Sequence, residues 1–120
     1  MRILHIAMIV SDIQQSADFY EGILGLRRDV RPDLGFSGIF YALDGGQQLH
    51  LMQIPNPYAA CALPEHGGRD RHLAFGVDDI DEIAERLAQA GIGFTRSRSG
   101  RAAMFCRDPD GNVIELCEVA

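Results

Sequence analysis

Apolar and polar positions along the first half of the chain predict four short strands and one helix. Residues 3–10 form an almost continuous apolar run, rich in β-branched side chains, that is typical of a buried strand. Apolar side chains then recur at helical spacing as far as Leu24, and Ser11 with Gln14 forms a capping-box pattern that predicts where this helix begins. Gly25 suits its end. Further strands are predicted at residues 26–30, 36–43 and 48–53, the last two joined by a hairpin turn.

The second half of the chain repeats this order of elements. Residues 71–77 predict a strand, and Asp79 with Glu82 repeats the capping-box pattern before an amphipathic helix that ends at Gly91. The last three predicted strands are residues 94–96, 102–107 and 112–119. Because the whole order recurs, the sequence predicts an α+β fold of two tandem β-α-β-β-β modules.

The two predicted modules are separated by a stretch with the composition of a loop. Residues 55–68 read PNPYAACALPEHGG, and the prolines and glycines in them indicate a linker or covering loop. We therefore expect one domain over residues 1–120, with module one at 1–54 and module two at 69–120.

Three histidines and one glutamate occupy matching positions in the two modules. His5 and His72 lie in the first strand of each module, and His50 and Glu115 each lie four residues after the last glycine of a hairpin turn. Apolar neighbours flank both, so strand alternation sends His50 and Glu115 to the face opposite those neighbours. Each residue alone is more often structural or solvated. Together they would gather imidazoles and a carboxylate in one cleft, a ligand set that suits a divalent first-row metal ion.

Composition narrows the class of protein further. The 120 residues are 47% hydrophobic and 23% charged with a net charge of −6, which disfavours a nucleic-acid or anionic-membrane partner. No apolar run is long enough to span a membrane, and the N-terminus lacks the cleavage site of a signal peptide. Three cysteines, Cys61, Cys106 and Cys117, form no CxxC pair. We therefore expect a reduced, cytoplasmic protein, and a structural role for His66 in the linker.

Four stretches of the sequence resemble the vicinal oxygen chelate superfamily, which includes glyoxalase I, bleomycin resistance proteins, fosfomycin-resistance thiol transferases and extradiol dioxygenases. They read LHIAMIVSDIQQSADFYEGILGL, QLHLMQIP, RHLAFGVDDIDEIAERLAQAGI and FCRDPDGNVIEL. The resemblance implies paired modules whose curved sheets enclose a metal ion, with His5, His72 and Glu115 as ligands. His50 stands where glyoxalase I usually has a carboxylate. The resemblance also implies that Glu115, the one carboxylate of the set, moves the proton in a glyoxalase-type reaction.

Departures from the pattern separate the members of the superfamily. Ile9 and Ile54 stand where bacterial glyoxalases place the arginine and asparagine that hold glutathione, so use of glutathione is expected to be weak or absent. Phe105 replaces a tyrosine of the dioxygenases, which disfavours that reaction. A thiol transferase needs cationic side chains for a phosphonate, and three arginines in one loop are candidates: Arg96, Arg98 and Arg101.

The resemblance is closest to glyoxalase I-like proteins. It implies a metal-dependent lyase or isomerase for detoxification that acts on a small substrate chelating the metal through adjacent oxygens. One ion of Ni, Zn, Mn or Co per site and a homodimer are expected. The alternatives are a metal-dependent thiol transferase of the fosfomycin-resistance type and a metal-free binding protein for a drug or other small molecule.

Overall fold

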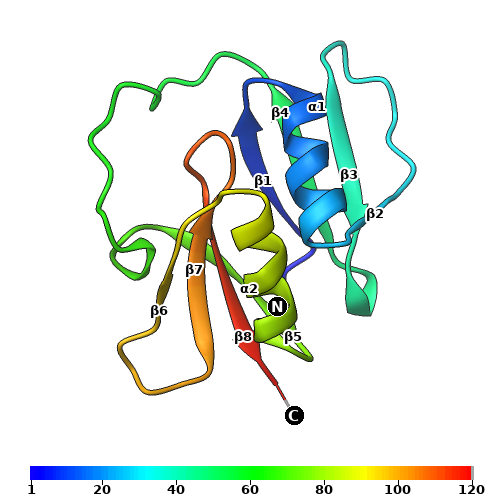
Figure 1. Cartoon of the computed structure of the whole chain (residues 1–120). Helices are drawn as coiled ribbons and strands as arrows, with labels where there is room; N and C mark the ends of the chain where they lie inside the picture. Colours follow the sequence, from blue (N-terminus) through cyan, green and yellow to red (C-terminus); the bar gives the residue numbers. More distant parts are fainter. Residues whose placement is uncertain (120) are drawn as a thin grey trace. The chain divides into compact units, whose positions relative to one another are not determined.

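The chain folds into two compact units, Met1–Ala60 and Cys61–Ala120, and the computed structural model describes residues 1–119 (Figure 1). The elements of the first unit are β1 (His5–Val10), α1 (Ile13–Ala17) with its π-helical continuation η1 (Asp18–Ile23), β2 (Arg27–Arg28), β3 (Gly38–Ala42), the 3₁₀ turn η2 (Asp44–Gly46) and β4 (Gln48–Gln53). Those of the second are the 3₁₀ turn η3 (Gly67–Arg69), β5 (His72–Val77), α2 (Ile80–Gln89), β6 (Phe94–Arg96), β7 (Ala103–Arg107) and β8 (Val113–Glu118).

Each unit contains a four-stranded mixed sheet with the same topology. The strand order is β1-β4-β3-β2 in the first unit and β5-β8-β7-β6 in the second. The edge strand that opens each unit runs parallel to the last strand, and the other neighbours are antiparallel. This confirms the predicted α+β fold of tandem β-α-β-β-β modules. No helix among residues 1–119 is long and apolar enough to cross a membrane.

The two helices begin at aspartates, and one of these differs from the prediction. Asp12, not Ser11, caps α1: its Oδ1 accepts from the backbone N–H groups of Gln14 and Gln15 at 2.8 and 3.2 Å. The reason is position, because the capping side chain belongs to the residue directly before the first helical residue, Ile13, and Ser11 lies one residue too early.

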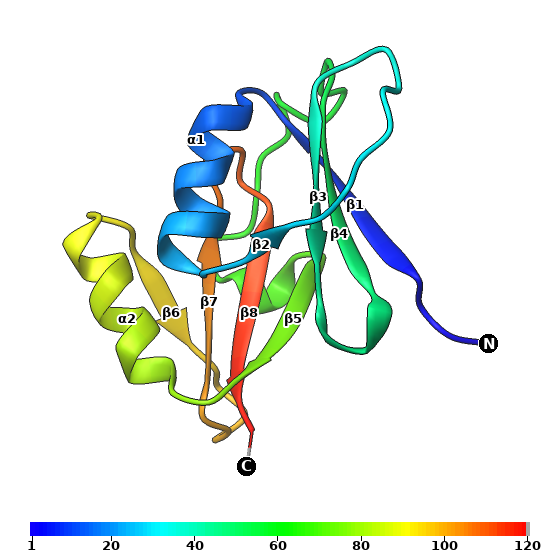
Figure 2. The same ribbon diagram turned by 90° about the vertical axis from the view of Figure 1, so that its right-hand side faces the viewer.

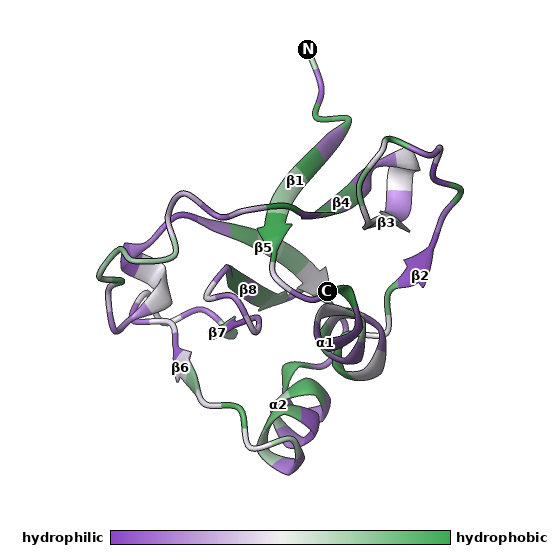
Figure 3. Cartoon of the chain, turned by 90° about the horizontal axis from the view of Figure 1, so that it is seen from above, coloured by the Kyte–Doolittle hydropathy of each residue, from purple (hydrophilic) through white to green (hydrophobic). Residues whose placement is uncertain are grey.

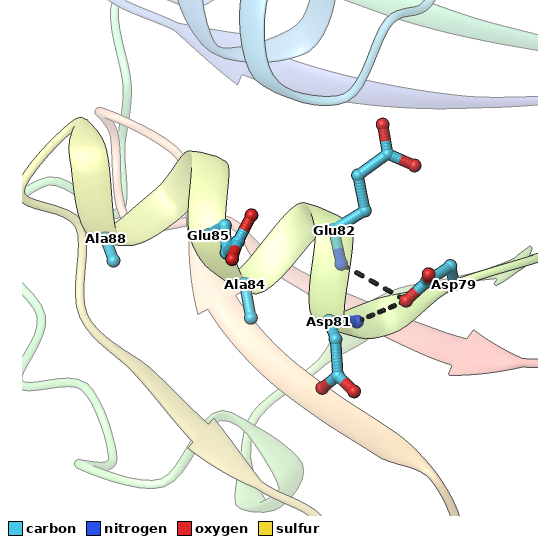
Figure 4. A pocket seen from close by; sticks show the side chains of 6 residues that line it. All are labelled: Asp79, Asp81, Glu82, Ala84, Glu85 and Ala88. Atoms are coloured by element: carbon cyan, nitrogen blue, oxygen red, sulfur yellow. Dashed lines mark hydrogen bonds between the residues drawn. The ribbon is translucent and has the colours of Figure 1, made fainter.

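In the second unit the predicted cap is confirmed. Asp79 Oδ1 accepts from the backbone N–H groups of Asp81 and Glu82 (Figure 4). The Glu82 side chain forms an ion pair with Arg86 one turn along the helix. Apolar and polar residues alternate along α2, as Figure 3 shows, and its apolar residues Ile80, Ile83 and Leu87 are buried.

Strand alternation directs apolar side chains to the core of each unit. Leu49 and Leu51 are fully buried on either side of His50, and Ile114 and Leu116 are almost fully buried on either side of Glu115. In the second unit α2 runs along the strands (Figures 1 and 2), and its first backbone N–H, of Ile80, donates to Glu118 on β8. Because their neighbours along the strand point into the core, His50 and Glu115 point to the opposite face of their sheets.

Candidate functional site

In the first unit, the face opposite the core gathers His5, His50 and Phe40. Ala7 on β1 and Phe40 on β3 are the direct ladder partners of His50 on β4. The His5 and His50 rings stack at a centroid distance of 4.0 Å, and Phe40 stacks on His50 at 3.5 Å and 6°. The His50 imidazole is therefore sandwiched between two rings.

A polar chain leads away from the edge of the His50 ring. His50 Nε2 lies 2.8 Å from Oε1 of Gln48, and Nε2 of Gln48 donates to Oδ2 of Asp29 at 2.9 Å. Burial, followed by the neighbouring His5 and Arg31, lowers the pKa of His50 below its usual range. Because a lowered pKa disfavours the protonated ring, His50 is held as a neutral imidazole at neutral pH.

In the second unit, His72 and Glu115 face each other across β5 and β8. His72 Nε2 lies 3.1 Å from Glu115 Oε2, and His72 Nδ1 lies 2.8 Å from the backbone oxygen of Asp70. A carbonyl oxygen only accepts, so His72 Nδ1 carries the hydrogen. His72 Nε2 and Glu115 Oε2 then face each other as two acceptors unless a proton or a metal cation lies between them.

The second oxygen of Glu115 is held by its neighbours. Oε1 accepts from Nη2 of Arg101 at 2.9 Å and from the Cys117 thiol at 3.1 Å. The carboxylate is only 4% exposed, and a buried carboxylate is costly unless charges and donors compensate it. Arg101 supplies the compensating charge and orients Oε2 toward His72.

These donor atoms fit a divalent metal ion. Nitrogen and oxygen ligands of tetrahedral Zn²⁺ lie about 2.0–2.2 Å from it, which places two neighbouring ligand atoms roughly 3.3–3.6 Å apart. The His72–Glu115 separation of 3.1 Å is a few tenths of an ångström shorter, so a small outward shift of either side chain gives this spacing. In the first unit, His5 and His50 are the candidate nitrogen donors, and imidazole nitrogens suit Ni, Zn, Mn or Co.

The four predicted ligands fall into two pairs, one in each unit. His5 and His50 belong to the first unit, and His72 and Glu115 to the second. Over residues 1–119, no three His, Cys, Asp or Glu side chains lie together closely enough to hold a metal ion. Each unit thus carries half of the predicted ligand set.

Several contact residues were not identified from the sequence. Gln48, Asp29 and Phe40 surround His50, and Asp70 fixes His72 through its backbone. Strand alternation could have found Gln48, which lies two residues before His50 on the same face. Asp29 was predicted to lie in a strand over residues 26–30, but β2 covers only Arg27–Arg28, and Asp70 lies before β5. Strand alternation therefore places neither side chain.

The three arginines of the predicted cationic loop do not act as one group. Arg101 pairs with Glu115, whereas Arg96 pairs with Asp81 at 3.4 Å and lies over the ring of Phe94. His66 Nδ1 lies 2.7 Å from the Thr95 hydroxyl, and its ring packs edge-on against Phe105, which agrees with a structural role.

The cysteines and an acidic hollow add no further ligand set. All three cysteines are free, and burial raises the pKa of the Cys106 thiol to about 12, which keeps that thiol protonated. The hollow lies along α2 and contains neither histidine nor cysteine (Figure 4). Its lining residues are Asp79, Asp81, Glu82, Ala84, Glu85 and Ala88.

Comparisons with known proteins identify the family of the chain. Residues 2–116 match the family model of the Glyoxalase/Bleomycin resistance protein/Dioxygenase superfamily. A lactoylglutathione lyase of Haemophilus influenzae is 31% identical over 126 aligned positions, which cover 98% of this chain and 93% of that protein.

Two solved structures share the fold at lower identity. A fosfomycin resistance protein from Listeria monocytogenes, in complex with Mn(II) and a dihydroxypropylphosphonic acid, has a TM-score of 0.75 at 21% identity and covers 99% of this chain and 92% of its own. An antibiotic-binding protein from a Streptomyces species has a TM-score of 0.72 at 24% identity and covers 100% of this chain and 97% of its own.

Proposed function

The chain belongs to the glyoxalase/bleomycin resistance protein/dioxygenase superfamily, and on this basis we propose that it is a metal-dependent, glyoxalase I-like lyase or isomerase. Its substrate is a small molecule that offers the metal two adjacent oxygens. The observation that carries the proposal is the His72–Glu115 pair, in which an imidazole nitrogen faces a buried carboxylate oxygen at 3.1 Å. A binding protein that works without metal has no need of this costly arrangement.

The proposed metal ligands are His5, His50, His72 and Glu115. A bound divalent ion supplies Lewis-acid polarisation of the substrate oxygens. His5 and His50 lie in the first unit, and His72 and Glu115 lie in the second.

Glu115 is the residue proposed to move a proton between adjacent carbons of the substrate. Arg101 holds Oε1, so Oε2 is the oxygen available for this step. Phe105, which is the ladder partner of Glu115 and 7% exposed, keeps water from this side of the carboxylate. Phe40 is the ladder partner of His50 and occupies the matching place in the first unit.

The arginine contacts favour the lyase over the thiol transferase. A phosphonate would need cationic side chains beside the metal, but Arg101 is engaged by Glu115 and Arg96 by Asp81. Detoxification of a small reactive carbonyl compound is the role that fits this reaction class.

The free cysteines suit a reducing compartment, and we place the protein in the cytoplasm on that basis.

Metal content tests the proposal most directly. Protein purified without chelator is expected to contain about one equivalent of Ni, Zn, Mn or Co per chain, measured by elemental analysis. Apoprotein should regain the ion on titration. Failure to bind any of the four metals would contradict the enzyme and favour the metal-free binding protein.

We also propose that the protein is a homodimer with two metal sites. The first strand of each unit, β1 and β5, lies at the edge of its sheet, and exposed strand edges invite pairing with another chain. Ile3 and Leu4, directly before β1, are 60% and 61% exposed. Light scattering at micromolar concentration should give twice the chain mass of 13.2 kDa, and the mass of a monomer would refute the dimer.

A further inference from the structure

We propose that Gln48, held by Asp29, fixes the His50 imidazole as its Nε2–H tautomer and so presents Nδ1 as the metal-binding atom. The tautomer is a property of the chain itself. The assignment of Nδ1 to a metal ion rests on the proposed function.

Asp29 determines which way the Gln48 amide points. Its Oδ1 accepts from the Val30 backbone N–H at 2.8 Å, and its Oδ2 lies 2.9 Å from the Gln48 amide. The hydrogen bonds from Gln48 and Val30 lower the pKa of Asp29, so this group is a carboxylate at neutral pH. Because a carboxylate only accepts, the side of the amide that faces Asp29 is its NH₂ group.

The orientation of the amide then determines the tautomer of His50. With the NH₂ group of Gln48 turned to Asp29, the carbonyl oxygen Oε1 faces His50 Nε2 at 2.8 Å. This oxygen only accepts, so His50 Nε2 must carry a hydrogen. A neutral imidazole carries one ring hydrogen, which leaves the lone pair on Nδ1.

The packing around His50 keeps the ring in this position. His5 stacks on one face of the imidazole and Phe40 on the other, at centroid distances of 4.0 and 3.5 Å. A ring held on both faces cannot easily rotate to exchange its two nitrogens. The hydrogen bond that His50 donates to Gln48 is therefore made by a ring whose orientation is already fixed.

The second unit fixes its histidine in the opposite way. Val113 pairs with His72 at the ladder position where Gln48 pairs with His5, so an amide at this place occurs in the first unit alone. His72 donates from Nδ1 to the Asp70 carbonyl and presents Nε2 to Glu115. His50 thus presents Nδ1, whereas His72 presents Nε2.

The experiment reads the tautomer in metal-free protein. Long-range ¹H–¹⁵N correlation spectra of histidine-labelled protein distinguish Nε2–H from Nδ1–H, and His50→Gln identifies the signals of His50. The wild type is expected to show the Nε2–H form. In Asp29→Asn the new amide keeps the Val30 bond through its oxygen and turns its NH₂ toward Gln48. The Gln48 amide then reverses, and His50 becomes the Nδ1–H form.

Two further variants make the test specific. Asp33→Asn is the matched control, because Asp33 accepts from Gly35 in the loop before β3 and should leave His50 unchanged. Gln48→Leu removes the amide and should give a mixture of both forms. An Nδ1–H form in the wild type, or an unchanged tautomer in Asp29→Asn, would overturn the proposal.

A titration with Zn²⁺ tests the choice of ligand atom. Asp29→Asn should bind the ion about tenfold more weakly. Loss of a residue that orients a metal ligand typically lowers metal affinity by about 10- to 100-fold. Equal or tighter binding would show that His50 binds through Nε2 and would overturn this part. A wild type that binds no metal would refute the proposed function, while the spectra of the metal-free protein still decide the tautomer.

Discussion

Replacing Glu115 with glutamine is expected to remove most of the metal affinity while leaving the protein folded. Structural zinc sites with four ligands bind their ion with ~10–16 kcal/mol, so one ligand accounts for roughly 3 kcal/mol, or at least about 100-fold in affinity. Proton transfer by a positioned side chain contributes ~10²–10⁴-fold, so any turnover should fall by at least that factor.

The substitution should be tolerated structurally. Glutamine has nearly the same shape as glutamate. Its oxygen can still accept from Arg101 and Cys117, which in the wild type donate to Glu115 Oε1 at 2.9 and 3.1 Å. Metal affinity is measured by calorimetric titration of apoprotein, and folding by thermal unfolding. The matched control is Glu85→Gln, an exposed position on α2 in the same unit, which should change neither quantity.

The histidines provide the same test with a different control. His5→Ala and His72→Ala should each lower metal affinity by a similar factor and leave the protein folded, because neither residue belongs to the buried apolar core. His66→Ala should leave metal affinity unchanged, although it removes the bond to Thr95. If the variants of His5, His72 and Glu115 retain metal but unfold at lower temperature, these residues are structural and the proposed site is wrong.

Most strands could be predicted because they depend on local chemistry. Alternation also predicted that His50 and Glu115 point away from their buried apolar neighbours, whereas their ladder partners Phe40 and Phe105 came from the structure. The first helix start was missed by one residue, because Ser11 and Asp12 are both good capping residues and only geometry distinguishes them.

The chemistry around each candidate ligand was harder to predict, because it depends on contacts between distant residues. The sequence does not show that Arg101 reaches Glu115 while Arg96 turns to Asp81, since all three loop arginines have the same chemistry. The link from Asp29 through Gln48 to His50 joins a loop to a strand 19 residues away. Such links follow from the path of the chain after β2 and have no period in the sequence.

Turnover of the methylglyoxal–glutathione hemithioacetal is expected to be weak even in metal-loaded protein, with kcat/KM below ~10⁴ M⁻¹s⁻¹. Ile9 and Ile54 stand where the matching bacterial glyoxalases hold glutathione with arginine and asparagine. A lost charge-assisted hydrogen bond costs about 1.5–3 kcal/mol, so two losses that add would weaken binding by about 100-fold or more.

A gain-of-function variant makes this expectation sharper. Ile9 lies on β1 two residues after Ala7 and four after His5, so all three side chains share one face of the sheet. An arginine at position 9 would therefore lie on the face that carries the candidate ligands. Ile9→Arg should raise kcat/KM for the hemithioacetal by ~10-fold or more, mainly through KM, since one charge-assisted bond is restored. Ile3→Arg adds the same charge at an exposed position before the strand and should not raise kcat/KM.

Wild-type turnover at or above ~10⁴ M⁻¹s⁻¹ would show that glutathione is held by other residues. Arg98 would be the first to replace, because Arg96 and Arg101 are engaged by carboxylates.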